Sequence, residues 1–371
     1  MRGRGIVAAS VVLCVLFLLL AHVCGVELKP TEPGTDEPAV GIPPPPPPPP
    51  DNPLVRAIRT IEVGEPIWCK GLGVFPLLQR RVTDDRLYLT LDEALKRGEL
   101  VVKEVGSGSV PRVSVRNNSD HYVFLLGNEV LVGGKQNRML REDLLLRPQS
   151  GEVLAEVFCV ERGRWHNPDM EFRKSEQMVD QEMRRRVAKD ADQGAVWEEV
   201  DRFARERGVS SRTSDLSEMQ ADTRVAADLA EYERAILPKL PPETAGLVAV
   251  RGPVILGADI FANEDLFGKL RRKLIQSYAL TKVREPHIAM VMSRRQVEDF
   301  LRRCYHTHYS DREAPDVGRR VRLQGGGITG MGLSFRDSLV HVVLFAEPER
   351  RPAPEPEPIP RPIVPRRPPG R

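Results

Sequence analysis

Residues 112–134 read "RVSVRNNSDHYVFLLGNEVLVGG", and short apolar runs alternate there with residues that favour turns. The turn residues are Asn117 to Asp120, Gly127 with Asn128, and Gly133 with Gly134. The next stretch, "LLLRPQSGEVLAEVFCVERGRW", repeats the pattern with a turn at Pro148 to Gly151. This spacing is typical of antiparallel strands, so the first half predicts an antiparallel sheet or sandwich.

Helical periodicity follows in a strongly charged region. Apolar residues recur every four positions from Val179 to Ala191, and a second apolar stripe from Val196 stops at Gly208. A third helix is expected to start near Ser217, with Gln220 completing a capping box, and to end before Pro238. The charges are typical of a solvated face, with a surface for partner proteins as the alternative.

Helices and strands alternate in the remainder of the chain. Thr90 is expected to cap a short helix that ends at Gly98. The strings "GLVAV" and "PVILGADIF" are strand-like, Asn263 caps a further helix, and Ser293 begins another capping box. The pattern predicts an α+β fold: a mainly antiparallel β-sheet or sandwich core with a charged helical insertion over about residues 168–237.

Both ends differ from this globular part. Residues 1–25 place Arg2 and Arg4 before an apolar run, the order of a signal peptide, and the run is also long enough for a membrane anchor. Residues 26–53 are a proline-rich linker, and residues 348–371 are a proline-rich tail. Both proline-rich segments are expected to be disordered, because they lack the apolar residues that a core requires. The globular α+β domain is therefore predicted at residues 54–347.

These ends predict an extracytoplasmic protein, either secreted or periplasmic, or anchored through an N-terminal transmembrane segment if that segment stays uncleaved. The proline-rich segments could bind envelope proteins, although a stalk or spacer explains them more simply. The net charge is only +3, which provides no specific nucleic-acid signature. Cys69, Cys159 and Cys304 do not form a disulfide framework, although one pair could bridge in an oxidising compartment.

Residues 131–138, "LVGGKQNR", are the first candidate binding element. Glu129 and Gln136 stand where a phosphate loop requires glycine and a hydroxyl residue, so that loop is excluded. Anion binding remains possible by another route, through a close backbone approach at the two glycines and through the polar side chains of Lys135, Gln136, Asn137 and Arg138. The alternative is a hairpin turn with a polar rim.

A second polar set follows the strand Val153 to Val160, which is expected to be apolar on both faces. Glu161, Arg164 and Trp165 could stack a base or sugar and pair with a phosphate. Alternatively, Trp165 covers the edge of the core while Arg164 pairs with Glu161. Cys159 is expected to be a small buried hydrophobic residue.

Three further patterns contain residue types that occur in functional sites. "CYHTHYSD" places Cys304, His306 and His308 at alternate positions, as a zinc site could, but surface histidines explain it better and we predict no metal site. "LQGGGITGMG" lacks a following helix, which excludes a dinucleotide fingerprint. Asp259 is either a site carboxylate or a turn residue that caps backbone amides.

The strings "YLTLDEALKRGEL", "LLGNEVLVGGKQNR" and "VFCVERGRW", followed by "VWEEV" and "GADIF", resemble the ADP-ribosylglycohydrolase- and rhodanese-phosphatase-associated protein domain family. The resemblance covers most of Ile61 to Phe345, and Glu129 fills the acidic position that precedes "GGKQNR" in the family. It implies an association with ADP-ribose and phosphate chemistry, and it assigns no reaction or cofactor.

We therefore expect a binding module for an anionic small molecule, with nucleotide-like ligands as candidates. Its predicted pocket combines two sets of polar residues, which are Glu129, Gly133, Gly134, Lys135, Gln136, Asn137 and Arg138 in the first motif and Glu161, Arg164 and Trp165 in the second. The first alternative is a hydrolase in which Glu129 or Glu161 acts as general base. The second is a structural envelope protein in which both motifs only brace the sheet.

Overall fold

The computed structural model describes residues 50–82, 84–106, 111–164, 171–281 and 291–347. The predicted signal or anchor, the linker up to residue 49 and the tail 348–371 lie outside the described residues. Export, anchoring and binding through the proline-rich segments therefore stay predictions. Within the described ranges, no helix combines the length and the apolar character that crossing a membrane requires.

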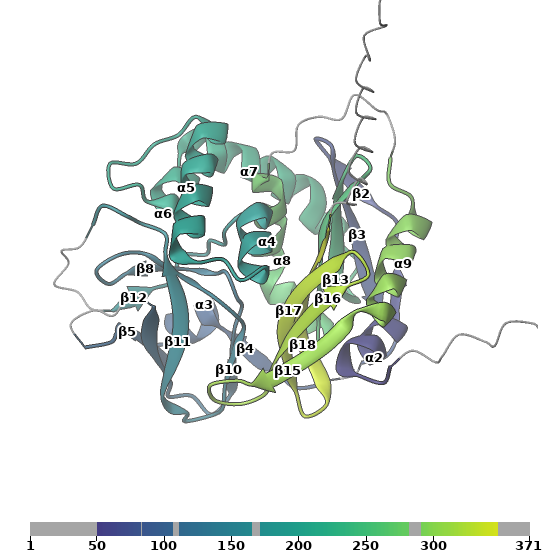
Figure 1. Ribbon diagram of the computed structural model, residues 1–371, viewed down its shortest axis with the longest axis horizontal. Helices are drawn as coiled ribbons and strands as arrows, with labels where there is room; N and C mark the ends of the chain where they lie inside the picture. Colours follow the sequence, from purple (N-terminus) through teal and green to yellow (C-terminus); the bar gives the residue numbers. More distant parts are fainter. Residues whose placement is uncertain (1–49, 83, 107–110, 165–170, 282–290, 348–371) are drawn as a thin grey trace, which may run out of the picture. The chain divides into compact units, whose positions relative to one another are not determined.

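The fold is α+β with mainly antiparallel sheets, as predicted (Figure 1). The largest sheet of the described residues has nine strands, in the order β1 (Ile61–Val63), β3 (Leu72–Gln79), β13 (Thr244–Arg251), β14 (Val254–Phe261), β18 (Ser338–Ala346), β17 (Ile328–Phe335), β16 (Arg319–Gly325) and β15 (His308–Glu313), with β2 (Ile67–Cys69) paired to β3. All of its strand pairs are antiparallel.

The region predicted to form antiparallel strands, residues 112–164 as far as they are described, contributes to two smaller sheets. A six-stranded sheet has the order β12 (Phe172–Arg173), β8 (Val130–Gly133), β9 (Arg138–Leu140), β11 (Gly151–Cys159), β6 (Arg112–Asn117) and β5 (Leu100–Glu104). A three-stranded sheet has the order β10 (Leu144–Leu146), β7 (Tyr122–Leu125) and β4 (Tyr88–Thr90), in which β4 and β7 are parallel. Buried apolar side chains of both sheets form one shared core.

The helices begin and end at residues with clear capping chemistry. They are α2 (Pro53–Arg59), α3 (Leu91–Lys96), α4 (Gln181–Ala188), α5 (Gln193–Arg207), α6 (Leu216–Gln220), α7 (Thr223–Ile236), α8 (Glu264–Leu280) and α9 (Arg294–Arg303), with 3-10 turns η1 (Leu237–Lys239) and η2 (Cys304–His306). The expected caps at Thr90, Asn263 and Ser293 are confirmed, and Gly208 ends α5 at φ +64°.

The expected third helix is wrong in one respect, because two helices occupy its place. Asp215 caps α6 and Asp222 caps α7, each by accepting a backbone N–H, whereas Ser217 lies inside α6. The Asp222 carboxylate offers the backbone a local hydrogen bond that interrupts the helix and starts a new one. The expectation for β11 also needs correction, since Leu154 on this strand is 44% exposed and its first half is not apolar on both faces.

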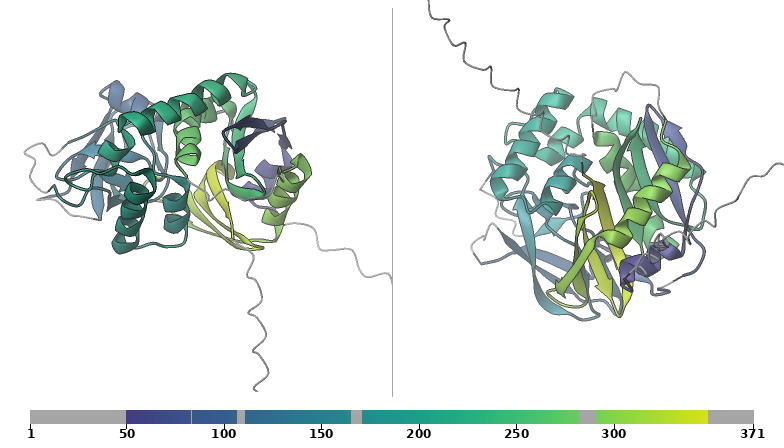
Figure 2. Two further views of the ribbon diagram at one scale, coloured as in Figure 1. Left: turned by 90° about the horizontal axis from the view of Figure 1, so that it is seen from above. Right: turned by 45° about the vertical axis from the view of Figure 1, so that its right-hand side comes forward.

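The nine-stranded sheet has a hydrophobic core on each face. Alternate residues of β13 divide between them: Leu247 and Ala249 belong to one core, and Val248 and Val250 to the other. Helices α2 and α9 contribute to the second core and α4, α5, α7 and α8 to the first, and the views in Figure 1 and Figure 2 agree with this division. Strand β13 is buried on both faces, and this is why its segment "GLVAV" is continuously apolar.

A buried charge network links the sheets. Asp259 in β14 forms an ion pair with Arg184 of α4 and accepts a hydrogen bond from the Tyr278 hydroxyl of α8 at 2.6 Å. His341 in β18 lies 3.1 Å (Nε2) from Asp259 and 2.7 Å (Nδ1) from Asp143, which directly precedes β10. Asp259 is therefore not a turn residue, because β14 continues past it, and its carboxylate is fully buried within this network.

The network stabilises the charged states of Asp259 and His341. Burial disfavours the Asp259 carboxylate, but the attraction of Arg184 and the hydrogen bond from His341 outweigh it and lower the pKa of Asp259 to about 2. Burial likewise lowers the pKa of His341, while the attraction of Asp143 and hydrogen bonds to Asp143 and Asp259 raise it to about 9. An imidazolium can donate from both ring nitrogens, which matches the two carboxylates beside it.

The network predicts that stability falls at alkaline pH. The folded-state pKa of His341 is above its usual value, so its contribution is complete below about pH 6.5 and is lost as pH rises through about 9. The difference in unfolding free energy between wild type and His341→Gln should shrink over that window by roughly 3 kcal/mol. Urea unfolding at several pH values measures it, and equal pH slopes for both proteins would contradict the assignment.

Candidate functional site

The two glycines of "LVGGKQNR" are required by close packing against the chain itself. A Cβ at Gly133 would lie 2.5 Å from the Glu171 carbonyl oxygen, and one at Gly134 would lie 2.5 Å from the Phe172 ring. Both glycines have positive φ, of +129° and +52°. The glycines therefore allow β8 to approach β12, and the space beside their Cα atoms is filled by protein.

Several backbone N–H groups of this loop already have acceptors within the chain. Four of them donate to protein oxygens: Gly133 N to Asn137 Oδ1 (2.9 Å), Gly134 N to Glu171 O (3.1 Å), Lys135 N to Glu104 Oε1 (3.0 Å) and Asn137 N to Glu161 Oε2 (3.0 Å). Two of these acceptors are carboxylates. The loop thus has the anion affinity that its composition predicts, but its anions are Glu104 and Glu161 of the same chain.

Arg138 lies beneath the loop and is fully buried. Its guanidinium is 3.2 Å from the Glu104 carboxylate and donates to the Gln136 side chain at 3.0 Å and to the Cys159 thiol. Gln136 also donates to the Arg162 carbonyl oxygen at 3.2 Å. Arg138 and Gln136 therefore brace the junction between β9 and β11, where Cys159 is buried as expected.

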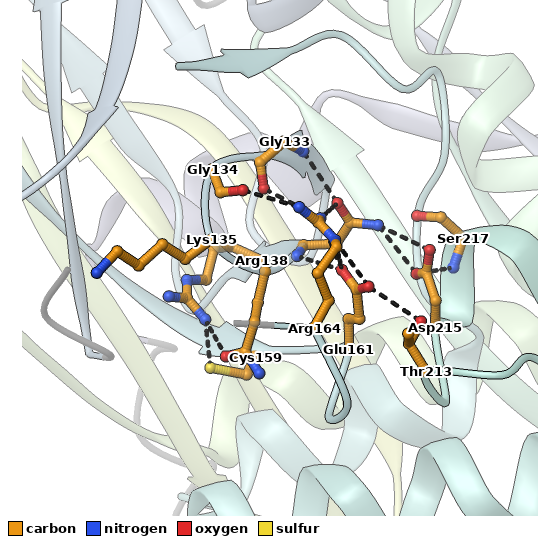
Figure 3. Close-up of polar contacts among 12 residues, drawn as sticks. Gly133, Gly134, Lys135, Arg138, Cys159, Glu161, Arg164, Thr213, Asp215 and Ser217 are labelled. Atoms are coloured by element: carbon orange, nitrogen blue, oxygen red, sulfur yellow. Dashed lines mark hydrogen bonds and ion pairs between the residues drawn. The ribbon is translucent and has the colours of Figure 1, made fainter. Parts of the chain in front are cut away.

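The second motif closes over the loop. Arg164 binds the Glu161 carboxylate at 2.7 Å, and it also donates to the Gly134 carbonyl at 2.8 Å and to Asn137 Oδ1 at 3.0 Å. Asn137 in turn donates to both carboxylate oxygens of Asp215 at 3.0 Å. We call Asn137, Glu161, Arg164 and Asp215 the carboxylate cluster, and Figure 3 shows Arg164 between the glycine carbonyls and Glu161.

Not every predicted site residue joins this cluster. The Lys135 side chain extends away from it in Figure 3. Glu129 is fully buried elsewhere, where it forms an ion pair with Lys273 of α8 and accepts the Leu126 N–H at 3.0 Å. Trp165 lies outside the described residues. The structure therefore brings together the two motifs at Gly133, Gly134, Asn137, Glu161 and Arg164, and it separates Glu129 from them.

A cavity of about 650 Å³ lies beside the carboxylate cluster. Both motifs contribute to its lining, together with β12, the following segment, and the loop and helix around Asp215. The residues that line it are Val132, Gly133, Asn137, Glu161, Arg164, Arg173, Lys174, Ser175, Gln177, Arg212, Thr213, Asp215, Ser217, Glu218 and Ala221. The lining thus combines four basic residues with three acidic ones.

Arg212 and Asp215 are the most informative lining residues that the sequence alone did not single out. Arg212 is exposed and has no side-chain hydrogen bond or ion pair within the described part of the chain. Asp215 is buried, and burial raises its pKa although Asn137 and the Ser217 N–H donate to it. The string "TSDLSEMQ" is compatible with a helix cap at Asp215. Its contact with Asn137 could not be predicted from the sequence, because the two residues are 78 positions apart.

The structure also places the cysteine–histidine pattern, the glycine-rich pattern and the three cysteines. Cys304 is buried in η2, whereas His308 is exposed at the start of β15. Over the described ranges, no group of three or more His, Cys, Asp or Glu side chains is arranged so that it could hold a metal ion. Gly326 and Gly327 form the turn between β16, which ends at Gly325, and β17. Cys69, Cys159 and Cys304 are not bridged.

The buried position of Arg138 predicts a structural effect of its removal. Arg138→Ala leaves the Glu104 carboxylate buried without its counter-charge, which should lower the unfolding free energy by about 3 to 5 kcal/mol. Arg205 is an exposed arginine of α5, and Arg205→Ala should change stability by no more than about 0.5 kcal/mol. Chemical denaturation compares the two, and equal stability of both variants would rule out the bracing role.

Comparisons with known proteins identify a family for the chain but no solved structure of the same fold. The family model of the ARG and Rhodanese-Phosphatase-superfamily-associated Protein domain, ARPP-1, matches residues 60–345. No curated protein and no solved structure gives a match. The matched range includes all three sheets, both motifs and the cavity. The chain therefore belongs to the ARPP-1 domain family.

Proposed function

We propose that the chain binds a small anionic molecule in the cavity beside the carboxylate cluster. The ligand class is a phosphorylated sugar or a nucleotide-like molecule such as ADP-ribose. The observation that supports this most is the convergence of both motifs on one cavity that carries an exposed arginine, Arg212. A volume of about 650 Å³ is in the usual range of small-molecule pockets.

The charges of the cavity divide into two kinds. Arg164 forms an ion pair with Glu161 and a hydrogen bond with the Gly134 carbonyl oxygen. Its charge is therefore already balanced, and its role is to hold the cavity wall in place. Arg212 has no described partner, and Arg173 and Lys174 also line the cavity. These side chains give the ligand a cationic side where a phosphate could form charge-assisted hydrogen bonds.

Asp215 supports the hydroxyl part of the ligand class. One of its oxygens accepts from both Asn137 and the Ser217 N–H, while the second accepts only from Asn137 among the described residues. A carboxylate oxygen has room for more than one donor, so the second oxygen can accept a sugar hydroxyl. The family's association with rhodanese-phosphatase proteins agrees with phosphate chemistry, as an analogy only.

A hydrolase is the second candidate, and the structure favours Asp215 over the two glutamates as its base. Glu129 is buried away from the cavity, and both oxygens of Glu161 are occupied by Arg164, Asn137 and Thr213. Asp215 lines the cavity, and burial raises its pKa. A carboxylate of this kind could take a proton from a water molecule next to a bound phosphate.

If the cavity binds an anion, replacing Arg212 should lower the affinity for the ligand without lowering the stability of the fold. Arg212→Gln should weaken binding of ADP-ribose or a sugar phosphate by roughly tenfold, which corresponds to one charged hydrogen bond, and should leave the melting temperature unchanged. Arg205→Gln is the matched control. A thermal-shift screen followed by calorimetry at low salt measures both quantities. No binding by the wild type, or equal affinity in both variants, would contradict the proposal.

The hydrolase candidate predicts a pH-dependent rate. Turnover of a phosphate ester or glycosidic phosphate should fall as the pH decreases through the raised pKa of Asp215, because only the ionised carboxylate can accept a proton. Asp215→Asn keeps the shape and should remove turnover while retaining binding. Unchanged turnover in this variant would eliminate Asp215 as the base, and binding without any turnover would leave a binding module.

A further inference from the structure

A second cavity lies far from both motifs in the sequence and is bordered by arginines. Its volume is about 600 Å³, and it lies between α2, the residues that follow β3, and the turn between β17 and β18. The residues that line it are Pro53, Arg56, Arg59, Thr60, Arg80, Arg81, Val82, Asp337, Ser338 and Leu339. Four of the ten are arginines, and one is acidic.

Two of the four arginines are held by the protein. Arg56 binds Asp51 at 3.0 Å and donates to the Asp337 carbonyl oxygen at 2.9 Å. Arg80 binds Glu62 at 2.6 Å. Their charges are therefore partly balanced, and these contacts fix α2 against the β17–β18 turn and the end of β3 against β1.

Arg59 and Arg81 are different. Both are exposed, and neither side chain has a hydrogen bond or ion pair within the described part of the chain. Asp337 also lines the cavity, but no described carboxylate forms an ion pair with either guanidinium. The cavity therefore keeps an excess of positive charge at a concave surface, where the fields of the two guanidiniums add. Val82, 48% exposed, gives the same cavity an apolar edge.

We propose that this arginine cavity is a second binding site, specific for a phosphate-bearing anion with at least two negative charges. The planar guanidinium offers paired N–H donors that match the oxygens of a phosphate. Two uncompensated arginines match a dianion, while the ion-paired Arg56 and Arg80 hold the walls in place. The phosphate could belong to a soluble polyphosphate or to a lipid headgroup, and the same chemistry recognises both.

This site is independent of the cavity beside the carboxylate cluster, because the two share no lining residue. The exposed positions of Arg59 and Arg81 also mean that their substitution removes no described contact. A charge-removing variant, Arg59→Gln with Arg81→Gln, therefore tests binding without disturbing the fold. A charge-keeping variant, Arg59→Lys with Arg81→Lys, and the distant Arg205→Gln are its controls.

The experiment uses the full chain and two probes at low salt. Calorimetry with inorganic tripolyphosphate measures binding of a soluble phosphate. Sedimentation with phosphatidylcholine vesicles, with and without cardiolipin, whose headgroup carries two phosphates, measures the headgroup contribution, since any apolar contribution of residues 1–25 is common to all variants. In at least one arm, the double Gln variant should bind at least roughly tenfold more weakly than wild type. The Lys variant should lose less, and Arg205→Gln nothing.

The arm that responds identifies the source of the phosphate. A loss with tripolyphosphate assigns a soluble ligand, and a loss confined to cardiolipin-containing vesicles assigns a membrane surface. Arg212→Gln should retain this binding, which separates the site from the cavity beside the carboxylate cluster. The proposal is overturned if the wild type binds neither probe, or if the double Gln variant and Arg205→Gln bind both probes equally.

Discussion

The interaction on which the site depends is the satisfaction of the loop's backbone amides by carboxylates of the same chain. Lys135 N donates to Glu104, and Asn137 N donates to Glu161. A carboxylate removed from water is costly unless a counter-charge accompanies it. Arg138 supplies that charge for Glu104, and Arg164 supplies it for Glu161. These two pairs explain why a glycine loop, a buried arginine and an "ERGR" string are needed together.

The same constraint operates in the centre of the fold. Asp259 is compensated by Arg184 and His341, and Glu129 by Lys273. Each of these pairs joins residues more than 70 positions apart, so each ties separate sheets or helices to one another. Buried pairs of this kind specify one arrangement of the elements, because any other arrangement strands a charge. The carboxylate cluster and its cavity are thus held by the same physics as the core.

The sequence predicted the local structure well, and it predicted long-range partners poorly. Capping at Thr90, Asn263 and Ser293 and the stop at Gly208 depend on residues within one helical turn, so they were readable. The strand character of residues 112–165 was readable from turn residues and apolar runs. In contrast, Asp259 was left open between a site carboxylate and a turn residue, because its partners Arg184 and His341 lie in other elements. Glu129 was placed with its motif neighbours for the same reason, although this residue, which directly precedes β8, forms an ion pair with Lys273 of α8.

The candidate site shows the same division. The motifs were recognisable as polar strings, and the pair Arg164 with Glu161 was anticipated as the structural alternative. Asp215 and Arg212 reach the cavity through a loop that the sequence links to no motif, so they were missed. The side chains of the two motifs brace the sheet. We propose that the residues at the cavity surface, above all Arg212, contact the ligand.

A crystal structure of the chain soaked with ADP-ribose tests this division of roles most directly. We expect the phosphate oxygens to lie at hydrogen-bond distance, about 3 Å, from the Arg212 guanidinium, and the Arg164–Glu161 and Arg138–Glu104 ion pairs to remain intact. A ligand phosphate that displaces Glu104 or Glu161 from the backbone amides of Lys135 or Asn137 would contradict it, because the glycine loop itself would then be the anion site.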